Sequence, residues 1–306
     1  MSLPLFALVG ATASGKTEAS LVLAERLGAE VICVDSMLVY RGMDVGTAKP
    51  TREQRARVKH HLLDLADPSE AFSVARFQSC AREAIADIVG RGSRPLLVGG
   101  GGLYYRAAVD QLEFPSTAHG IREMLSAEAA VLGPHALHGR LASFDPQAAG
   151  RIDPANVRRT IRALEVPAIT GRPFSSFARA WDRYPVGAVR AAGVRMDREI
   201  LYRRIEERVL RMMPGLLDEA GSLLERGYGD FITSSQAIGY SEAASCLRGE
   251  MSQDEAALRT TRRTKALARR QMAWLKRDPR IRWFVVGEEG APGIVEDVLI
   301  YFEESA

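Results

Sequence analysis

Gly10-Ala-Thr-Ala-Ser-Gly-Lys-Thr17 follows the apolar run Leu5-Phe-Ala-Leu-Val9 and precedes a stretch in which apolar residues recur at helical spacing. This order of strand, glycine-rich loop and helix matches the phosphate-binding pattern G-x-x-x-x-G-K-[ST]. The glycines let successive backbone N–H groups converge on a phosphate, Lys16 adds a positive charge, and Thr17 offers a hydroxyl to a magnesium ion. The sequence therefore predicts a site for a phosphorylated compound, which need not be a nucleotide.

The composition is that of a soluble globular protein. The 306 residues are 46% hydrophobic and 26% charged, with a net charge of +3, and this length suits one large domain or two ordinary ones. No apolar stretch approaches the roughly 20 residues that span a bilayer, and no cleavable leader precedes the loop, so we expect a cytoplasmic protein without membrane contact. The three cysteines are widely spaced, which favours neither a disulfide framework nor a zinc site.

The order of apolar patterns along the chain indicates two parts. Strand-like runs alternate with helical patterns up to about residue 112, and long helices at 198–226 and 254–277 with a strand at 281–286 follow residue 190. Between them, strand signals disappear and helical patterns are interrupted by Gly-Pro and Asp-Pro pairs. We predict an α/β fold: a P-loop NTPase-like parallel sheet core flanked by helices, formed by residues 1–114 and 191–306, with a helical insertion domain at 115–190.

Asp35 is the candidate catalytic residue. It follows the apolar run 31–34, and the carboxyl ends of neighbouring parallel strands open onto one crevice, so its carboxylate should face the ligand of the phosphate loop. A carboxylate beside a phosphate is unfavourable unless a metal ion or a proton transfer requires it. The alternative is that Asp35 only caps the turn that follows.

Two further stretches are candidates for contact with a substrate. Residues 40–50 are glycine-punctuated, polar and basic, which is typical of a substrate-facing loop but also of a solvated connector. Four glycines at 99–102 follow a strand and form either a hinge or a turn that comes close to a ligand.

The pair His60-His61 lacks further ligands at a suitable spacing, and adjacent residues point in different directions, so we do not expect a metal there.

Two stretches are rich in cations, one in the insertion and one along the expected helix 254–277. Such clusters are typical of proteins that bind a nucleic-acid backbone, although a solvated helix face would also be basic. The residues are Arg151, Arg158, Arg159 and Arg162 in the first stretch, and Arg259, Arg262, Arg263, Lys265, Arg269, Arg270, Lys276 and Arg277 in the second.

Nearly end to end, the sequence resembles the tRNA dimethylallyltransferases, which transfer an isopentenyl-type group to the exocyclic amine of an adenosine next to the anticodon. Residues 40–50 are the most specific part of this resemblance. Besides them and the phosphate loop, it rests on Val34-Asp-Ser36, His60-His-Leu-Leu-Asp64, Phe72-Ser-Val-Ala-Arg-Phe77, Val98-Gly-Gly, Gly102-Leu-Tyr104, Arg162-Ala-Leu-Glu165, Gln236-Ala-Ile-Gly-Tyr240, and Arg269-Arg-Gln271 with Trp274.

The resemblance implies transfer of a dimethylallyl group from dimethylallyl diphosphate to N6 of adenosine 37, in tRNAs that read codons starting with U, with release of diphosphate. Asp35 would take a proton from the N6 amine, and the target base would be turned out of its stack into a channel that meets the donor from the opposite side. Magnesium is the implied cofactor, with Thr17 as its direct or water-mediated ligand. We further expect a monomer that binds the tRNA anticodon stem-loop.

The resemblance also assigns residues to two binding sites. For the diphosphate it implies Gly10, Thr12, Ala13, Ser14, Gly15, Lys16, Thr17 and Arg198. For the tRNA it implies Asp35, Ser36, Met37, Arg122, Arg158, Arg159, Arg162, Arg269, Arg270 and Gln271.

At two positions the chain departs from the family pattern. Gly101 stands where relatives usually have Thr or Ser, and Leu38 stands where they commonly have Gln. Each departure removes a polar group, and a buried partner left unpaired would cost about 1–3 kcal/mol. We therefore expect slower turnover with substrate binding retained.

Three other functions stay open from the sequence. A small-molecule kinase would use the phosphate loop for ATP and Asp35 to deprotonate a hydroxyl, but it would leave the basic helices unused. An RNA-binding module with a degenerate phosphate loop would bind tRNA and form no product. A relative of the cytokinin-forming enzymes would prenylate a free adenine nucleotide, which does not require the insertion.

Overall fold

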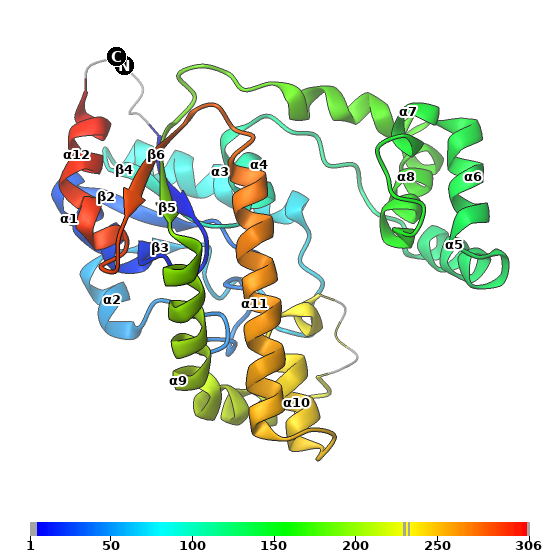
Figure 1. Ribbon diagram of the computed structural model, residues 1–306. Helices are drawn as coiled ribbons and strands as arrows, with labels where there is room; N and C mark the ends of the chain where they lie inside the picture. The colour runs from blue at the N-terminus through cyan, green and yellow to red at the C-terminus, as the bar shows by residue number, and fades with distance from the viewer. Residues whose placement is uncertain (1–4, 229–230, 232, 305–306) are drawn as a thin grey trace. The chain divides into compact units, whose positions relative to one another are not determined.

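The computed structural model describes residues 5–228, 231 and 233–304. Contacts between Cα atoms divide the chain into two compact units, a core unit of Met1–Asp110 with Pro185–Ala306 and a second unit of Gln111–Tyr184 (Figure 1). The range predicted for the insertion, 115–190, begins and ends a few residues after the second unit does. The difference at its end arises because the residues after Tyr184 lead into a strand of the core sheet.

The core unit contains a six-stranded, all-parallel sheet with the strand order β3-β2-β4-β1-β5-β6, which confirms the predicted fold class. β1 is buried along its whole length, as expected for a sheet covered on both faces. The strands are β1 Phe6–Gly10, β2 Ala29–Cys33, β3 His60–His61, β4 Arg94–Gly99, β5 Arg190–Met196 and β6 Ile281–Val286.

The register of the sheet places the carboxyl ends of β1, β2 and β4 side by side at one edge of the sheet. In β1 and β4, Val9 lies beside Gly99, and in β2 and β4, Cys33 lies beside Val98. The chain therefore leaves β1, β2 and β4 at neighbouring points, into the phosphate loop, the segment with Asp35 and the run of glycines. This alignment follows from parallel pairing of strands that end together.

Helices cover both faces of the core sheet (Figure 1). Phe6 and Leu8 point into the cluster formed with α1 and α12, where the rings of Phe6 and Phe302 stack 4.6 Å apart. Side chains alternate along a strand, so Ala7 and Val9 face the opposite side. The helices are α1 Lys16–Leu27, α2 Arg52–Arg57, α3 Val74–Gly90, α4 Gly102–Val109, α9 Arg198–Glu225, α10 Tyr240–Leu247, α11 Gln253–Leu275 and α12 Val295–Glu303, with short 3₁₀ turns at Ser234–Gln236 and Ala291–Ile294.

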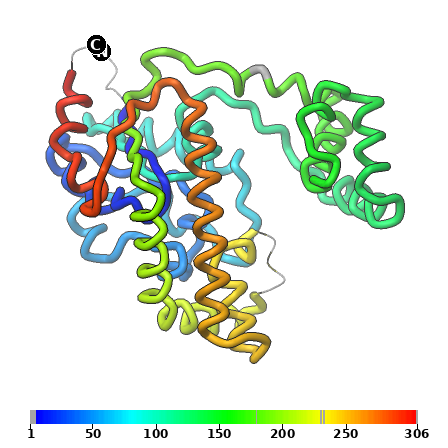
Figure 2. Tube along the Cα trace, in the orientation of Figure 1, coloured from blue at the N-terminus to red at the C-terminus, as the bar shows by residue number. Residues whose placement is uncertain are grey.

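The long helices α9 and α11 lie side by side, with α10 packed against both (Figure 2). Asp197 caps α9 by accepting hydrogen bonds from the backbone N–H groups of Glu199 and Ile200, and Ser252 caps α11 in the same way. Both helices were predicted from their apolar spacing, within two residues at each end. No helix in the described ranges is long and apolar enough to cross a membrane.

The second unit is helical and has its own apolar core, formed by leucines and alanines that include Leu125, Leu137 and Leu164. The pairs Gly133-Pro134 and Asp145-Pro146 lie at the starts of α6 and α7, because proline is favoured in the first turn of a helix. Its helices are α5 His119–Leu132, α6 Pro134–Phe144, α7 Pro146–Ala149 and α8 Val157–Thr170, followed by a 3₁₀ segment Phe174–Asp182.

Candidate active site

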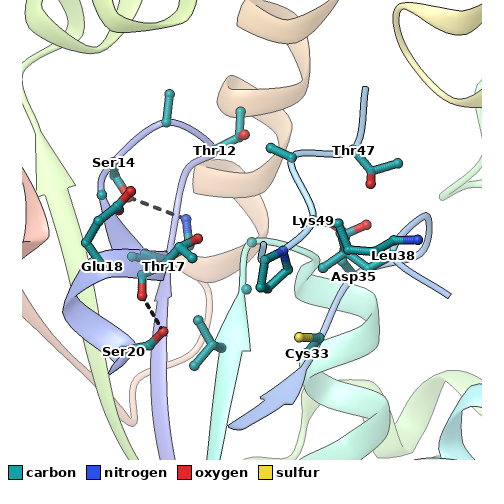
Figure 3. Close-up of a pocket in the computed structure, with 18 of the residues that line it drawn as sticks. Thr12, Ser14, Thr17, Glu18, Ser20, Cys33, Asp35, Leu38, Thr47 and Lys49 are labelled. Atoms are coloured by element: carbon teal, nitrogen blue, oxygen red, sulfur yellow. Dashed lines mark hydrogen bonds between the residues drawn. The ribbon is translucent and has the colours of Figure 1, made fainter. Parts of the chain in front are cut away.

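A cavity of about 520 Å³ lies within the core unit at the carboxyl ends of β1, β2 and β4. The phosphate loop forms one wall, and Asp35, Thr47 and Lys49 lie across the cavity from it (Figure 3). The lining also includes residues of α9 and α11, which complete the site from distant parts of the sequence. The lining residues are Thr12 to Glu18, Ser20, Val31, Cys33, Asp35, Leu38, Thr47 to Thr51, Gln54, His60, Val98 to Gly100, Arg204, Glu207, Arg208, Arg211 and Gln271.

The phosphate loop has the conformation that its sequence predicts. Gly15 has a φ of 84° and Ala13 a φ of 66°, both in the left-handed region. For Ala13, which carries a Cβ, this conformation is strained, and such strain persists where the surroundings impose it. The N-cap of α1 is Gly15, which has no side chain to accept from the first turn, so the backbone N–H groups there can bind an anion.

Three contacts from the C-terminal half hold this loop. The backbone N–H of Thr12 donates to Oε1 of Gln271 at 2.8 Å, and Nε of Arg204 donates to the carbonyl oxygen of Ala13 at 3.0 Å. The backbone N–H of residue 291 donates to the carbonyl oxygen of Ser14 at 2.9 Å. The loop is therefore fixed before any ligand binds.

Gln271, which was predicted to bind the tRNA, contacts the phosphate loop in this structure. Its side chain is buried, with its amide oxygen engaged by the phosphate loop. The position of the Gln271 side chain also requires glycine at residue 100, because a Cβ at Gly100 would lie 2.5 Å from Nε2 of Gln271. A Cβ at Gly102 would lie 2.6 Å from Cβ of Trp274. The glycines thus allow α11 to approach the ends of β1 and β4.

Two half-buried cations, Lys16 and Arg208, face the cavity. Nζ of Lys16 donates to the carbonyl oxygen of Ala11 at 2.5 Å, and burial together with the charge of Arg208 lowers the pKa of Lys16 to about 7. Burial also lowers the pKa of Arg208, and the charge of Asp35 opposes that shift. Within the described part of the chain, Nε of Arg208 is buried without a hydrogen-bond partner. This arrangement leaves positive charge in the cavity that a bound anion would balance.

Asp35 lines the same cavity and also caps its own turn. Its Oδ1 accepts a hydrogen bond from the backbone N–H of Met37 at 2.8 Å. Burial raises the pKa of the Asp35 carboxyl, although the N–H groups of Met37 and Leu38 and the charge of Lys16 act in the opposite direction. The two interpretations of Asp35 are therefore compatible, and a carboxylate with a raised pKa is a better proton acceptor.

Arg198 was predicted to bind the diphosphate, but the structure places it away from the cavity. It is exposed at the first residue of α9, whereas Arg204, Arg208 and Arg211 of the same helix line the cavity. Residues 204, 208 and 211 share one helix face, and residue 198 lies about 120° around the axis from residue 204. The spacing of these three arginines was visible in the sequence and is the signal that our prediction missed.

The arginines assigned to tRNA in the second unit fall into two groups. Arg158 and Arg159 lie in the first turn of α8. Arg122 and Arg162 instead bind the fully buried carboxylate of Glu165, at 2.9 Å and 2.6 Å. Arg162 also donates to the carbonyl oxygens of residues 115 and 116. These two arginines therefore have a structural task, which their residue type alone could not reveal.

The basic face of α11 is only partly committed to ion pairs. Arg259, Arg263 and Lys265 pair with Glu255, Glu242 and Glu206, as a solvated face would. Arg269 donates to the hydroxyl of Tyr202 at 3.0 Å, and both Arg269 and Arg270 are exposed.

The adjacent histidines have separate partners. Nδ1 of His60 contacts the carbonyl oxygen of Val58, and Nε2 of His61 contacts the carboxylate of Glu30. No group of three or more His, Cys, Asp or Glu side chains in the described residues could hold a metal ion. A cation in this cavity would therefore need ligand atoms from other groups, such as the hydroxyl of Thr17.

Comparisons with known proteins identify relatives of this chain. The model of a family described as IPP transferase matches residues 38–278, and a model described as isopentenyl transferase matches residues 3–70. The tRNA dimethylallyltransferase of Streptomyces coelicolor is 49% identical over 92% of this chain and 90% of its own length.

Solved structures show the same architecture. The tRNA isopentenylpyrophosphate transferase of Bacillus halodurans aligns with a TM-score of 0.70 and 41% identity, over 98% of this chain and 97% of its own. A eukaryotic dimethylallyltransferase acting on tRNA aligns with a TM-score of 0.78 over 97% of this chain and 77% of its own, and at 24% identity it shows the fold alone.

Proposed function

The chain belongs to the IPP transferase family, and we propose that it transfers a dimethylallyl group from dimethylallyl diphosphate to N6 of the adenosine next to the anticodon, in tRNAs that read codons starting with U. Diphosphate is the second product. The observation that carries this proposal is the single cavity in which Lys16 and Arg208 share space with Asp35. A cation pair and a proton acceptor around one space suit the departure of an anionic leaving group from a carbon attacked by an amine.

The donor would bind with its diphosphate on the phosphate loop. The backbone N–H groups at the start of α1 and the ammonium of Lys16 would hold it, and Arg208 would supply the second charge. Within the described residues, Nε of Arg208 is buried without a hydrogen-bond partner, which supports this assignment because a buried N–H group without an acceptor is costly. Of the predicted diphosphate residues, Arg198 is replaced by Arg208 in this proposal.

Magnesium fits the same place. Mg²⁺ in proteins is usually held by substrate phosphates, water and one or two side chains, and the Thr17 hydroxyl lines the cavity beside the loop. Thr17 and the diphosphate oxygens would hold the ion, directly or through water. When bound, it would add positive charge beside the leaving diphosphate.

The reaction itself needs one bond formed and one broken. The N6 lone pair forms a bond to the allylic carbon while the carbon–oxygen bond breaks, and its electron pair leaves with the diphosphate. The amine proton passes to Asp35, whose raised pKa makes its carboxylate a stronger proton acceptor. Lys16 and Arg208 stabilise the charge that develops on the leaving oxygen.

The tRNA would present its adenosine from the side of Asp35, Ser36 and Met37, turned out of the base stack. Exposed cations on α8 and α11, which are Arg158, Arg159, Arg269 and Arg270, would contact backbone phosphates. We also propose that the protein acts as a cytoplasmic monomer, and light scattering at working concentration tests the oligomeric state.

The direct test is a product assay. Protein, magnesium, dimethylallyl diphosphate and unmodified tRNA are incubated, and digested nucleosides are analysed by mass spectrometry for a prenylated adenosine. Parallel reactions contain free AMP as acceptor, or ATP in place of the donor. Prenylated tRNA supports the proposal, whereas product only with AMP, or phosphoryl transfer from ATP, contradicts it.

A further inference from the structure

One carboxylate binds the backbone of a loop that lies opposite the phosphate loop. Glu219 of α9 accepts hydrogen bonds from the backbone N–H groups of Asp44 at 2.9 Å, Val45 at 2.8 Å and Gly46 at 3.3 Å. It also accepts one from the hydroxyl of Tyr240 at 2.6 Å. Three consecutive N–H groups on one carboxylate fix the backbone of residues 44–46. These residues belong to a longer segment, residues 43–50, which we call the 43–50 loop.

The ring of Tyr240 completes this contact. Tyr240 is fully buried at the start of α10, and a Cβ at Gly46 would overlap its ring. The loop backbone can approach the ring only because residue 46 is glycine. Two segments that carry the family resemblance, residues 40–50 and 236–240, therefore meet at Glu219.

The other side of the loop is held by Lys49. Its side chain is buried, and its ammonium donates to the carbonyl oxygen of Tyr40 at 2.6 Å and pairs with Asp64 at 2.7 Å and Asp44 at 2.5 Å. Asp44 is thus bound through its side chain to Lys49 and through its backbone to Glu219. The two anchors act on the same few residues from opposite sides.

The C-terminal part of the 43–50 loop, which leads to α2, forms a wall of the cavity. Residues Thr47 to Thr51 line it, and Thr47 and Lys49 lie near Asp35, across from the phosphate loop (Figure 3). Ala48 has a φ of 53°, a conformation that an alanine keeps only when its neighbours impose it. The shape of this wall therefore depends on the anchors.

Helix α9 connects this wall to the opposite one. Arg204 holds the phosphate loop through Ala13, and Glu219 holds the 43–50 loop. The two residues lie 15 positions apart in the same helix, on either side of Pro214. Helix α9 thus carries contacts to both the donor side and the acceptor side of the cavity.

We propose that Glu219 and Tyr240 are positioning residues for the acceptor adenosine, which they serve by fixing the 43–50 loop beside Asp35. This inference rests on the function proposed above. It concerns the acceptor side alone, because the contacts that hold the phosphate loop come from other residues.

The test compares Glu219→Gln with Asp218→Asn, a neighbouring exposed carboxylate of α9 that removes the same charge. An amide in place of the carboxylate turns one acceptor oxygen into an NH₂ group, which cannot accept from the loop. We expect kcat/KM for tRNA to fall about tenfold or more, and KM for dimethylallyl diphosphate to change less than about twofold, since only the acceptor wall moves. Asp218→Asn should retain the wild-type constants.

A second variant tests whether the two residues act together. Tyr240→Phe removes only the hydroxyl and should lower kcat/KM for tRNA by a smaller factor. The double variant should be no slower than Glu219→Gln alone, because both changes release the same loop. Independent, multiplicative losses would contradict the proposal.

Hydrogen exchange provides a readout that does not depend on catalysis. The amides of Asp44, Val45 and Gly46 should exchange faster in Glu219→Gln than in the wild type or in Asp218→Asn. Unchanged exchange, or equal losses in the constants for both substrates, would overturn the inference. A wild-type protein that makes no product would instead contradict the proposed function, and the exchange result would still decide whether Glu219 holds the loop.

Discussion

The affinity for dimethylallyl diphosphate should fall as the pH rises through neutrality, because the donor requires the charged form of Lys16. Burial and the charge of Arg208 lower the pKa of Lys16 to about 7 in the free protein. A diphosphate beside the ammonium favours the charged form and raises that pKa in the complex. Binding above pH 7 must therefore take up a proton.

The size of the effect follows from this pKa. With a pKa of about 7, about half of Lys16 is charged at pH 7 and about 1% at pH 9. If only the charged form binds, Kd rises about 50-fold over these two pH units. The terminal phosphate of the donor adds no comparable change, since its last proton is lost near pH 6, as for other phosphate monoesters.

The assay is isothermal titration calorimetry at pH 7, 8 and 9, at constant magnesium, in two buffers of different ionisation enthalpy. The buffer dependence should show uptake of nearly one proton per donor at pH 8. A Lys16→Arg variant stays charged over this range and should lose the pH dependence. A Kd that is flat from pH 7 to 9, with no proton uptake, would refute the reasoning.

Further predictions concern single residues. Gln271→Ala leaves the N–H of Thr12 without its partner, so KM for the donor should rise about tenfold in steady-state kinetics. Gly101→Ser restores a hydroxyl of the family pattern and should raise kcat several-fold, with a small loss in Tm, because its Cβ would lie 3.1 Å from the carbonyl oxygen of Val34. Glu165→Gln should lower the free energy of unfolding by about 1–3 kcal/mol. Burial raises the pKa of Glu165, but hydrogen bonds from arginines and a backbone N–H outweigh it and lower the pKa. The difference should therefore shrink as the pH falls from the ordinary range of a glutamate pKa through that lowered pKa, and thermal unfolding at several pH values measures it.

Much of the donor side could be predicted from the sequence. The phosphate loop, Asp35 and the glycine run each follow a buried strand, and parallel pairing brings such turns to one edge of a sheet. The helices α9 and α11 were equally clear from their apolar spacing. These features depend on local pattern, which a single sequence displays.

The contacts that complete the cavity depend on long-range packing and could not be predicted. Gln271 and Thr12 are 259 residues apart in sequence, and Glu219 and Asp44 are 175 apart. No periodicity or motif in the sequence indicates that Gln271, on a basic helix, accepts a hydrogen bond from the backbone N–H of Thr12. The burial of Glu165 likewise decided the role of Arg162, and burial is a property of the folded unit.

The central claim is that Asp35 takes the proton of the adenosine amine in the cavity that holds the diphosphate. Single-turnover rates of wild type and Asp35→Asn, at saturating donor and tRNA, measure this step most directly, with Asp87→Asn as a surface control. The account predicts that Asp35→Asn binds both substrates but forms prenylated adenosine at least about 100-fold more slowly. A rate equal to that of the wild type would contradict it.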